Sequence, residues 1–203
     1  MTKTSPHGAR ASKKRNHLVA TALQLFYENG YHATGIDRIL AESGVAKMTL
    51  YKHFASKDDL IVAALDLRHQ QFLDWFVATL DAAGPNRRDQ LLAAFDALGE
   101  WFRGAAPTGP FHGCAFIKAL GEFPDLEHPV RRRVLAHKQS LRDHLAALAA
   151  EAGCAAPRRL ANHLSMLTEG AILTAQLSGQ TRVAQEAKDI GRLIIDDALA
   201  AQG

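Results

Sequence analysis

The sequence predicts an all-α protein, and three observations support this class. Alternating runs of β-branched residues, which are typical of strands, do not occur in the 203 residues. Ala and Leu instead recur at the three- and four-residue spacing of amphipathic helices, and hydrophobic residues make up 47% of the chain, enough for a sizeable core. Turn-forming Gly and Pro separate these periodic segments. We expect about nine helices.

The first sixty residues predict three short helices and a tight turn. A helix over about residues 13–29 ends at Gly30, a common helix terminator. A second opens at Thr34, because "TGID" is typical of an N-terminal cap with an acid at the third helical position. After a break at residues 43–45, a third covers about residues 46–54. An eight-residue helix, a glycine-containing turn and a short second helix predict a helix-turn-helix, whose second helix enters the DNA major groove.

The rest of the chain also reads as helices. "SKDD" predicts a capping box at Ser56 that opens a long helix toward Ala82, and a further helix carries Leu91, Phe95 and Phe102 in register. Residues 103–113 are too rich in Gly and Pro to be helical. Four more helices are expected, over about residues 114–123, 129–152, 158–178 and 183–201.

The positive charge is concentrated in the N-terminal third. Residues 1–60 carry nine Lys and Arg against five Asp and Glu, whereas the remainder carries fifteen against sixteen. A basic head on a nearly neutral body is the asymmetry expected of a nucleic-acid-binding protein. We therefore predict a flexible basic arm over residues 1–12, a helix-turn-helix DNA-binding domain over 13–58, and a larger helical domain over 59–203.

Several other classes are disfavoured. No apolar run approaches the roughly 18 residues that a membrane span needs, and the basic N-terminus lacks the apolar segment of a signal peptide. Two cysteines, Cys114 and Cys154, do not make a disulfide framework, which fits a reducing cytoplasm. We find no nucleophile–base motif, phosphate-cradling loop or paired metal-ligand spacing, so we expect neither an enzyme nor a metal or other cofactor. A non-specific packaging protein would spread its basic charge over the whole chain.

The segment that carries these features resembles a known family. Residues 22–60 read "ALQLFYENGYHATGIDRILAESGVAKMTLYKHFASKDDL", which is similar along its length to the TetR family of bacterial transcriptional regulators. One departure is Ala46, where the family often has a capping Ser, and the loss of such a cap costs about 0.5–2 kcal/mol. The resemblance implies a cytoplasmic homodimer that binds a double-stranded DNA operator. It also implies that residues 59–203 serve effector binding and dimerisation, and that a small-molecule effector relieves repression.

Polar residues of the expected third helix are the candidate DNA contacts. Lys47 is suited to guanine acceptors at a base edge. Thr49, Tyr51 and His53 can donate to phosphates or bases, and Lys52 to a phosphate. The alternative is a solvated helix face. We expect additional phosphate contacts from Thr34, Lys57, Lys14 and Arg15. The alternative for Thr34 is a capping role alone, and the alternative for Lys14 and Arg15 is a solvated tail.

Bulky residues at helical spacing are candidates for an apolar effector cavity between helices, although ordinary core packing would explain them too. They are Phe72, Trp75, Phe76, Phe95, Trp101, Phe102, Phe116, Phe123 and Met166. Polar anchors for an effector could come from Glu122, His128, Glu169 and Gln176, which could equally be satisfied surface residues.

The last two expected helices are the candidate dimer interface, because their equivalents pair between subunits in the family. The residues concerned are Ile172, Leu173, Ala175, Ile194 and Ile195. If they were not covered by a second subunit, they would leave an apolar patch, unless they fold onto the chain's own core.

Cys114 supports an alternative function. It begins an expected helix, where free N–H groups and the helix dipole favour a thiolate, and His112 is two residues away. The chain would then be a repressor that senses oxidants or electrophiles through Cys114. An inert buried thiol is the other interpretation.

Overall fold

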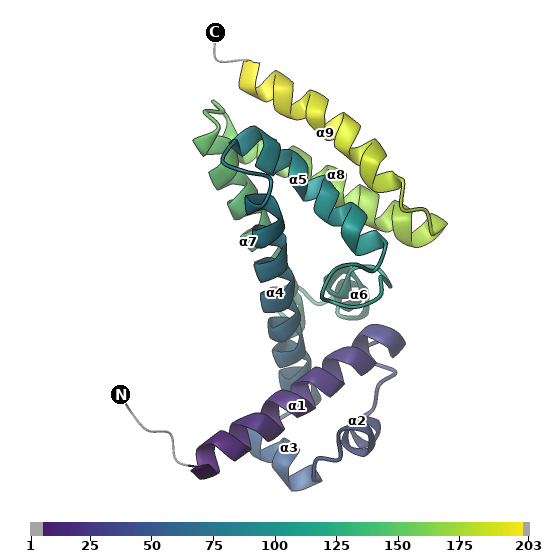
Figure 1. Cartoon of the computed structure of the whole chain (residues 1–203). Coiled ribbons are helices and arrows are strands. Elements are labelled where there is room, and N and C mark those ends of the chain that lie inside the picture. Colours follow the sequence, from purple (N-terminus) through teal and green to yellow (C-terminus); the bar gives the residue numbers. More distant parts are fainter. Residues whose placement is uncertain (1–5, 201–203) are drawn as a thin grey trace. The chain divides into compact units, whose positions relative to one another are not determined.

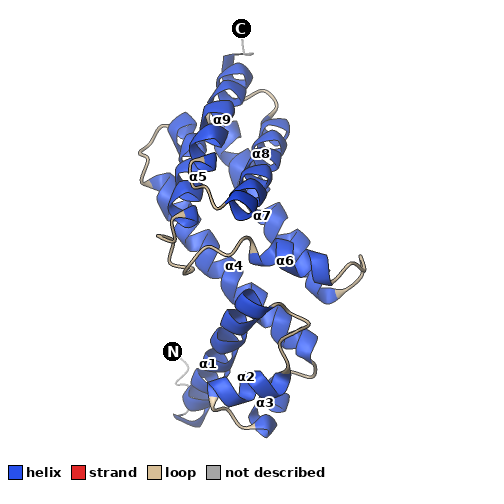
Figure 2. Ribbon diagram, turned by 90° about the vertical axis from the view of Figure 1, so that its right-hand side faces the viewer, coloured by secondary structure: helices blue, strands red, loops and turns tan. Residues whose placement is uncertain are grey.

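The computed structural model describes residues 6–200, with side chains from Lys13 onward. These residues form nine α-helices, and the described part of the chain contains no strand (Figures 1 and 2). The predicted all-α class is confirmed. The described chain divides into two compact units. The first runs up to His69 and also includes Ala115–Val134, and the second comprises Gln70–Cys114 and the chain from Leu135 onward.

The first unit is built around α1 (Pro6–Asn29), against which α2 (Ile36–Ser43) and α3 (Lys47–His53) pack. It also holds the first half of α4 (Lys57–Asp81) and all of α6 (Ala115–Glu122). The packing unit is therefore longer than the predicted range 13–58 and takes in a distant helix. α1 already includes residues 6–12 of the predicted flexible arm, and residues 1–5 lie outside the described residues.

The core of the first unit explains the local sequence pattern. Leu18, Phe26, Tyr31, Ile39 and Leu50 are fully buried. Burial of a large apolar side chain stabilises a fold by about 1.5–3 kcal/mol, so Ile39 and Leu50 hold the two short helices on α1. A helix of seven or eight residues is marginal alone, and this packing rather than propensity keeps both in place.

The helix ends agree with the sequence in two cases and differ in one. The Ser56 hydroxyl accepts from the Asp59 N–H at 3.1 Å and the Asp59 carboxylate accepts from the Ser56 N–H at 3.0 Å, which is the predicted capping box at α4. Ala46 precedes α3 without a side-chain cap. The prediction that Thr34 caps the second helix was wrong, because α2 begins at Ile36 and its N-cap is Gly35, which has no side chain.

The second unit contains α5 (Arg87–Phe102), α8 (Pro157–Ser178), α9 (Val183–Ala200) and most of α7 (Pro129–Glu151). Helices α5, α8 and α9 lie side by side (Figures 1 and 2). The close approach of α9 to α5 requires Gly191, since a Cβ there would overlap the buried ring of Phe95.

Candidate nucleic-acid interface and its connection to α6

One face of α3 is exposed and carries most of the predicted DNA contacts. Lys47, Met48, Tyr51 and Lys52 are exposed, and positions one helical turn apart lie on the same side of a helix. Thr49 and His53 are half-buried. The structure thus brings two cations and a phenol together on one surface of the helix-turn-helix, with the two remaining polar side chains at its margin.

The opposite face fixes α3 in the unit. Leu50 is fully buried, and Phe54, which is nearly so, lies under the Arg15 guanidinium at 5.2 Å from the ring centroid. The turn before α3 passes through Gly44 at φ 62°, a left-handed conformation that favours glycine. Ser43 supports the turn by accepting the Val45 N–H at its hydroxyl, over 3.3 Å.

Further cations surround this surface. Lys14 and Arg15 are exposed on α1, so both predicted basic residues lie in a helix and not in a tail. Lys57 donates to the His32 carbonyl at 3.1 Å. Lys47 lies 3.7 Å from the Asp37 carboxylate, and both side chains are largely exposed. Such a surface pair is worth about 0–1 kcal/mol, so a phosphate could replace Asp37 at little cost.

Thr34 does not belong to the exposed surface. It is fully buried, and its hydroxyl donates to the Gly30 carbonyl at 2.7 Å and approaches the Leu25 carbonyl at 3.2 Å. It therefore satisfies carbonyls at the C-terminal end of α1. The prediction that the Thr34 hydroxyl contacts a phosphate was therefore wrong.

Met48 is an exposed residue that the sequence reasoning missed. Its side chain is 86% exposed, on the same face as Tyr51 and Lys52. A large apolar side chain that faces solvent within a basic surface is suited to the methyl group of thymine, which apolar side chains contact in the major groove. Its position one turn before Lys52 was the available signal.

A second feature of the first unit is the way α6 docks along α1 and the turn that follows it. The Tyr31 hydroxyl donates to the Ala115 carbonyl at 2.9 Å, and the Lys118 ammonium donates to the Tyr27 carbonyl at 2.9 Å. The Glu122 carboxylate accepts the backbone N–H groups of Tyr31 at 2.8 Å and of the next residue at 2.5 Å. Positions 115, 118 and 122 share one helical face, so α6 is held along its whole length.

Lys118 and Glu122 each lie where the neighbouring backbone favours their charge. Lys118 lies at the C-terminus of α1, where the helix dipole favours a cation. Burial lowers its pKa, while the neighbouring Glu122 opposes that shift. Gly30, at φ 93°, lets the turn present successive N–H groups to Glu122, and a Cβ on Gly30 would lie 3.2 Å from the Glu122 Oε1.

Two of the expected effector anchors have other partners here. Glu122 holds the turn between α1 and α2, and the His128 Nε2 lies 3.2 Å from the Asp58 carboxylate. Both contacts lie within the first unit. These residues therefore stabilise the docking of the segment 115–134 on the helix-turn-helix.

The predicted effector residues divide between the two units. Phe116 and Phe123 are buried in the first unit, and Phe123 stacks with His128 at 4.7 Å between ring centroids. Met166 is 66% exposed, so it lines no enclosed cavity. Phe95 packs against Gly191. For these four residues, core packing or a surface position replaces the predicted pocket role.

The remaining predicted aromatics form a cluster in the second unit. Phe72 is its centre, with centroids 5.8 Å from Phe76, 5.2 Å from Trp101 and 5.9 Å from His137. Trp75 also contacts Phe72, and Phe102 contacts Phe111. The Trp101 indole N–H is buried and has no hydrogen-bond partner among the described residues, which is costly unless a ligand or water accepts it. Phe111 and His137 were not predicted, because the former lies in the Gly- and Pro-rich loop and the latter on a largely polar helix.

Cys114 lies beside a partly buried ion pair. The Lys138 ammonium is 3.6 Å from the Cys114 sulfur and 2.5 Å from a Glu169 carboxylate oxygen. Burial disfavours the charged form of Lys138, but the neighbouring Cys114 and Glu169 outweigh it and raise the pKa of Lys138. Glu169 therefore has a partner in α7.

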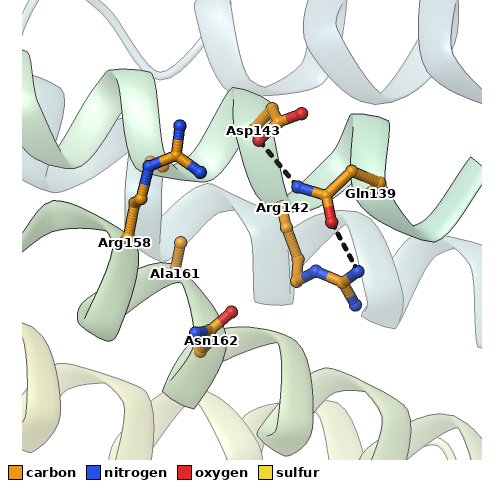
Figure 3. A pocket seen from close by; sticks show the side chains of 7 residues that line it. Gln139, Arg142, Asp143, Arg158, Ala161 and Asn162 are labelled. Carbon is orange, nitrogen blue, oxygen red and sulfur yellow. Dashed lines mark hydrogen bonds between the residues drawn. The ribbon is translucent and has the colours of Figure 1, made fainter. Parts of the chain in front are cut away.

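Neither of two cavities in the second unit is lined by the predicted aromatics. One, of about 290 Å³, is lined by polar residues of α7 and α8 (Figure 3). Gln139 there donates to Asp143 at 2.8 Å and accepts from Arg142 at 2.7 Å. The other, of about 200 Å³, includes Cys154 and His163.

The predicted dimer residues are only partly exposed. Ile172, Ala175 and Ile195 are buried within the chain, so the alternative of core packing holds for them. Ile194 is half-buried and Leu173 is exposed. The apolar residues that face solvent on these helices are Met166, Leu173 and Leu177 on α8, and Ile190 and Leu193 on α9.

The described residues contain neither a membrane-spanning helix nor a cluster of metal ligands. Among residues 6–200, no helix combines the length and apolar character of a membrane span. In the same part of the chain, His, Cys, Asp and Glu side chains nowhere gather in a group of three or more that could hold a metal ion.

Comparison with known proteins gives a consistent family. The family described as "Bacterial regulatory proteins, tetR family" matches residues 18–64, and "Tetracyclin repressor-like, C-terminal domain" matches residues 87–190. A solved structure of a TetR-family transcriptional regulator from Streptomyces coelicolor, SCO4454, is similar at a TM-score of 0.82 and 36% identity, covering 93% of this chain and 97% of that one. The predicted family resemblance is confirmed.

Curated relatives include both activators and repressors. The transcriptional activator FasR of Mycolicibacterium smegmatis is 38% identical over 86 residues, which is 42% of this chain and 39% of FasR. The transcriptional repressor NemR of Escherichia coli is 29% identical over 117 residues, 58% of this chain and 57% of NemR. The chain thus spans less than two thirds of the length of these relatives. Since they are transcriptional regulators, they agree with the prediction that the chain is not an enzyme.

Proposed function

Because this chain belongs to the TetR family of bacterial transcriptional regulators, we propose that it is a ligand-responsive repressor that binds a palindromic operator as a homodimer. The exposed face of α3 is the observation that carries the proposal. It combines Lys47 and Lys52 with Tyr51 on a helix-turn-helix whose other face is buried. Its target, bacterial DNA, gives the protein a cytoplasmic site of action.

In the proposed complex α3 enters the major groove. Lys47 and Met48 contact base edges, the former at guanine and the latter at a thymine methyl. Tyr51, Lys52 and Lys57 contact phosphates and so fix the register of the helix. Thr49 and His53 add weaker contacts from the margin. Lys14 and Arg15 extend the basic surface along α1 and contribute mainly to salt-dependent affinity.

The proposed dimer interface uses the exposed apolar residues of α8 and α9. Met166, Leu173 and Leu177 recur at seven and four residues on α8, so they form one stripe. Ile190 and Leu193 are one turn apart on α9. A second copy of the chain would bury these side chains and place two α3 helices on half-sites a whole number of helical turns apart.

The effector site is proposed at the aromatic cluster of the second unit. The buried indole N–H of Trp101, which no described residue accepts, favours a ligand with a hydrogen-bond acceptor on an otherwise apolar body. To lower operator occupancy, the effector must bind the form that is not competent for DNA more tightly, by about 1–3 kcal/mol. Since α6 is bonded to the α1–α2 turn through Glu122, a shift of α6 would disturb the helix-turn-helix directly.

Binding-site selection tests the function. Purified protein is mixed with random duplexes at a fixed near-physiological salt concentration, and the bound fraction is sequenced. The proposal predicts an enriched palindrome. Retention of all duplexes at low salt only, with no enriched sequence, would contradict it and support non-specific binding.

Sedimentation velocity tests the assembly. The wild-type chain should sediment as a dimer, whereas Leu173→Glu should sediment as a folded monomer with reduced operator affinity. Leu126→Glu, at an exposed apolar residue outside α8 and α9, is the matched control and should remain dimeric. A dimeric Leu173→Glu variant would contradict the proposed interface.

Repression itself is tested with a reporter gene placed behind the selected operator. A repressor would lower the expression of this gene, whereas an activator would raise it.

A further inference from the structure

The cavity of about 200 Å³ in the second unit has an apolar floor and a charged rim. It lies between the start of α8 and the last two turns of α9, and these helices pack side by side (Figure 1). Small side chains at Ala155, Ala156 and Ala198 leave the space between them unfilled. Ligand pockets combine an apolar lining with a few polar groups that fix orientation. This α8–α9 cavity therefore has the composition of a site for a small ligand.

The floor of the α8–α9 cavity is the least exposed part of its lining and consists of Cys154, Leu160 and Ile194. Cys154 and Leu160 are buried, and Ile194 is half-buried. A buried free cysteine packs like a small apolar residue. Contact with this floor would remove apolar ligand surface from water, which favours a ligand with an apolar side chain. The volume is below the roughly 300–1,000 Å³ of pockets for drug-sized molecules, so that side chain must be short.

The rim of the α8–α9 cavity carries polar groups from both helices. Arg159 and His163 lie one turn apart on α8, Asp197 lies on α9, and all three side chains are exposed. None of the three has a hydrogen bond or ion pair with another described residue. On α9 this sets Asp197 apart, because the other charged residues that the structure describes there each have a partner of opposite charge: Glu186, Lys188, Asp189, Arg192 and Asp196. The carboxylate of Asp197 is thus available to a ligand.

We propose that the α8–α9 cavity binds a small apolar amino acid in its zwitterionic form. The ligand carboxylate pairs with the Arg159 guanidinium, whose parallel N–H donors match two carboxylate oxygens, and a ring N–H of His163 donates a further hydrogen bond. The ligand ammonium donates to the Asp197 carboxylate, and the apolar side chain rests on the floor. A simple carboxylate would meet the like charge of Asp197, and a simple amine would meet that of Arg159. A ligand with both charges therefore complements the rim best.

Isothermal titration calorimetry of the folded full-length protein with L-leucine and L-valine at pH 7 tests the proposal. Two analogues keep the leucine side chain but lack one charge: 4-methylpentanoate has no ammonium, and 3-methylbutylamine has no carboxylate. Glycine keeps both charges but lacks the side chain. L-Leucine should bind roughly tenfold or more tightly than each of these three, because each loses hydrogen bonds to a charged group or the contact with the floor. Absence of binding by both amino acids at millimolar concentration, or equal affinity for L-leucine and its analogues, would overturn the proposal.

Two substitutions at exposed positions separate the contacts with the two ligand charges. Arg159→Gln should weaken binding of L-leucine and 4-methylpentanoate by roughly tenfold or more without weakening that of 3-methylbutylamine. Asp197→Asn should weaken L-leucine and 3-methylbutylamine without weakening 4-methylpentanoate. A general disturbance of the fold would not produce this exchange of selectivity. Arg158→Gln, at a neighbouring exposed arginine that does not line this cavity, is the matched control and should bind L-leucine as the wild type does. Equal losses of L-leucine affinity in Arg158→Gln and Arg159→Gln would contradict the assignment.

Sedimentation velocity of the same variants tests the other occupant of the cavity, a second copy of the chain. His163 lies one turn before Met166, the first residue of the proposed dimer stripe on α8. Arg159→Gln and Asp197→Asn should sediment as the wild type does. If they lost the dimer and L-leucine did not bind, the rim would belong to the dimer interface and the proposal would fail. Because ligand binding is measured without DNA, a protein that binds L-leucine but selects no operator would contradict the proposed function alone.

Discussion

Replacing Glu122 with Gln should loosen the turn that joins α1 to α2. The Glu122 carboxylate accepts two backbone N–H groups, from Tyr31 at 2.8 Å and His32 at 2.5 Å. Gln is nearly isosteric, but only one of its two terminal atoms can accept, so one N–H would face an amide donor. Hydrogen bonds to charged groups contribute about 1.5–3 kcal/mol each when well shielded. Because Glu122 is half-exposed, we expect a total loss of about 1–3 kcal/mol.

Amide hydrogen exchange measures this loss at the residues concerned. Each 1.4 kcal/mol of lost protection corresponds to a tenfold faster exchange, so the amides of Tyr31 and His32 should exchange roughly 5- to 140-fold faster in Glu122→Gln. Glu127→Gln is the matched control, because its carboxylate is largely exposed and pairs with the exposed Arg132 at 3.4 Å. Unchanged exchange at both amides in Glu122→Gln would refute the role that we assign to this carboxylate.

Two further predictions concern packing and pH dependence. Gly191→Ala should lower the free energy of unfolding by about 1–3 kcal/mol, since the new Cβ would overlap the buried Phe95 ring. Gly121→Ala is the control: a Cβ there meets no described atom within 4 Å, so this change should raise the free energy of unfolding by about 0.5–1 kcal/mol. Equal effects of the two changes in denaturant titrations would contradict the packing of α9 against Phe95. Burial lowers the pKa of His144, against smaller opposing effects of Asp81 and Glu151. As the pH falls through about 6.5, the unfolded chain therefore binds more protons at His144 than the folded chain does. The free energy of unfolding should decrease as the pH falls through this range. The free energy of unfolding should differ less between pH 8 and pH 5.5 in His144→Phe than in the wild type. An equal difference in the two proteins would refute this effect of His144.

The helix-turn-helix was predictable because its signals are local. Apolar spacing, the glycine turn and the Ser56 capping box each act within a few residues, and the structure places them as expected. Thr34 was misread for the opposite reason. Its hydroxyl bonds to carbonyls of residues that precede it, at the end of α1, and the sequence pattern alone does not distinguish that contact from a cap of the next helix.

The contacts of residues after the helix-turn-helix were not predictable, because they join residues far apart in the sequence and no local pattern encodes them. Glu122 meets residues about 90 positions earlier, and Lys138 of α7 meets Cys114, which immediately precedes α6. Apolar residues on the last two helices showed the correct helical spacing, but periodicity does not tell which side faces the chain's own core. Ile172 and Ile195 accordingly proved buried, while Leu177 and Leu193 are exposed.

The affinity of Lys52→Ala for the selected operator, measured over a series of salt concentrations, tests the central claim most directly. Lys52 is exposed on α3, so the variant should bind more weakly at every salt concentration. The slope of log affinity against log salt should fall by about one unit for each phosphate that the protein no longer neutralises. Arg158→Ala, which removes an exposed cation from α8, should leave affinity and slope unchanged. Unaltered binding by Lys52→Ala, or equal reductions of affinity in the two variants, would contradict the assignment of α3 as the DNA-binding helix.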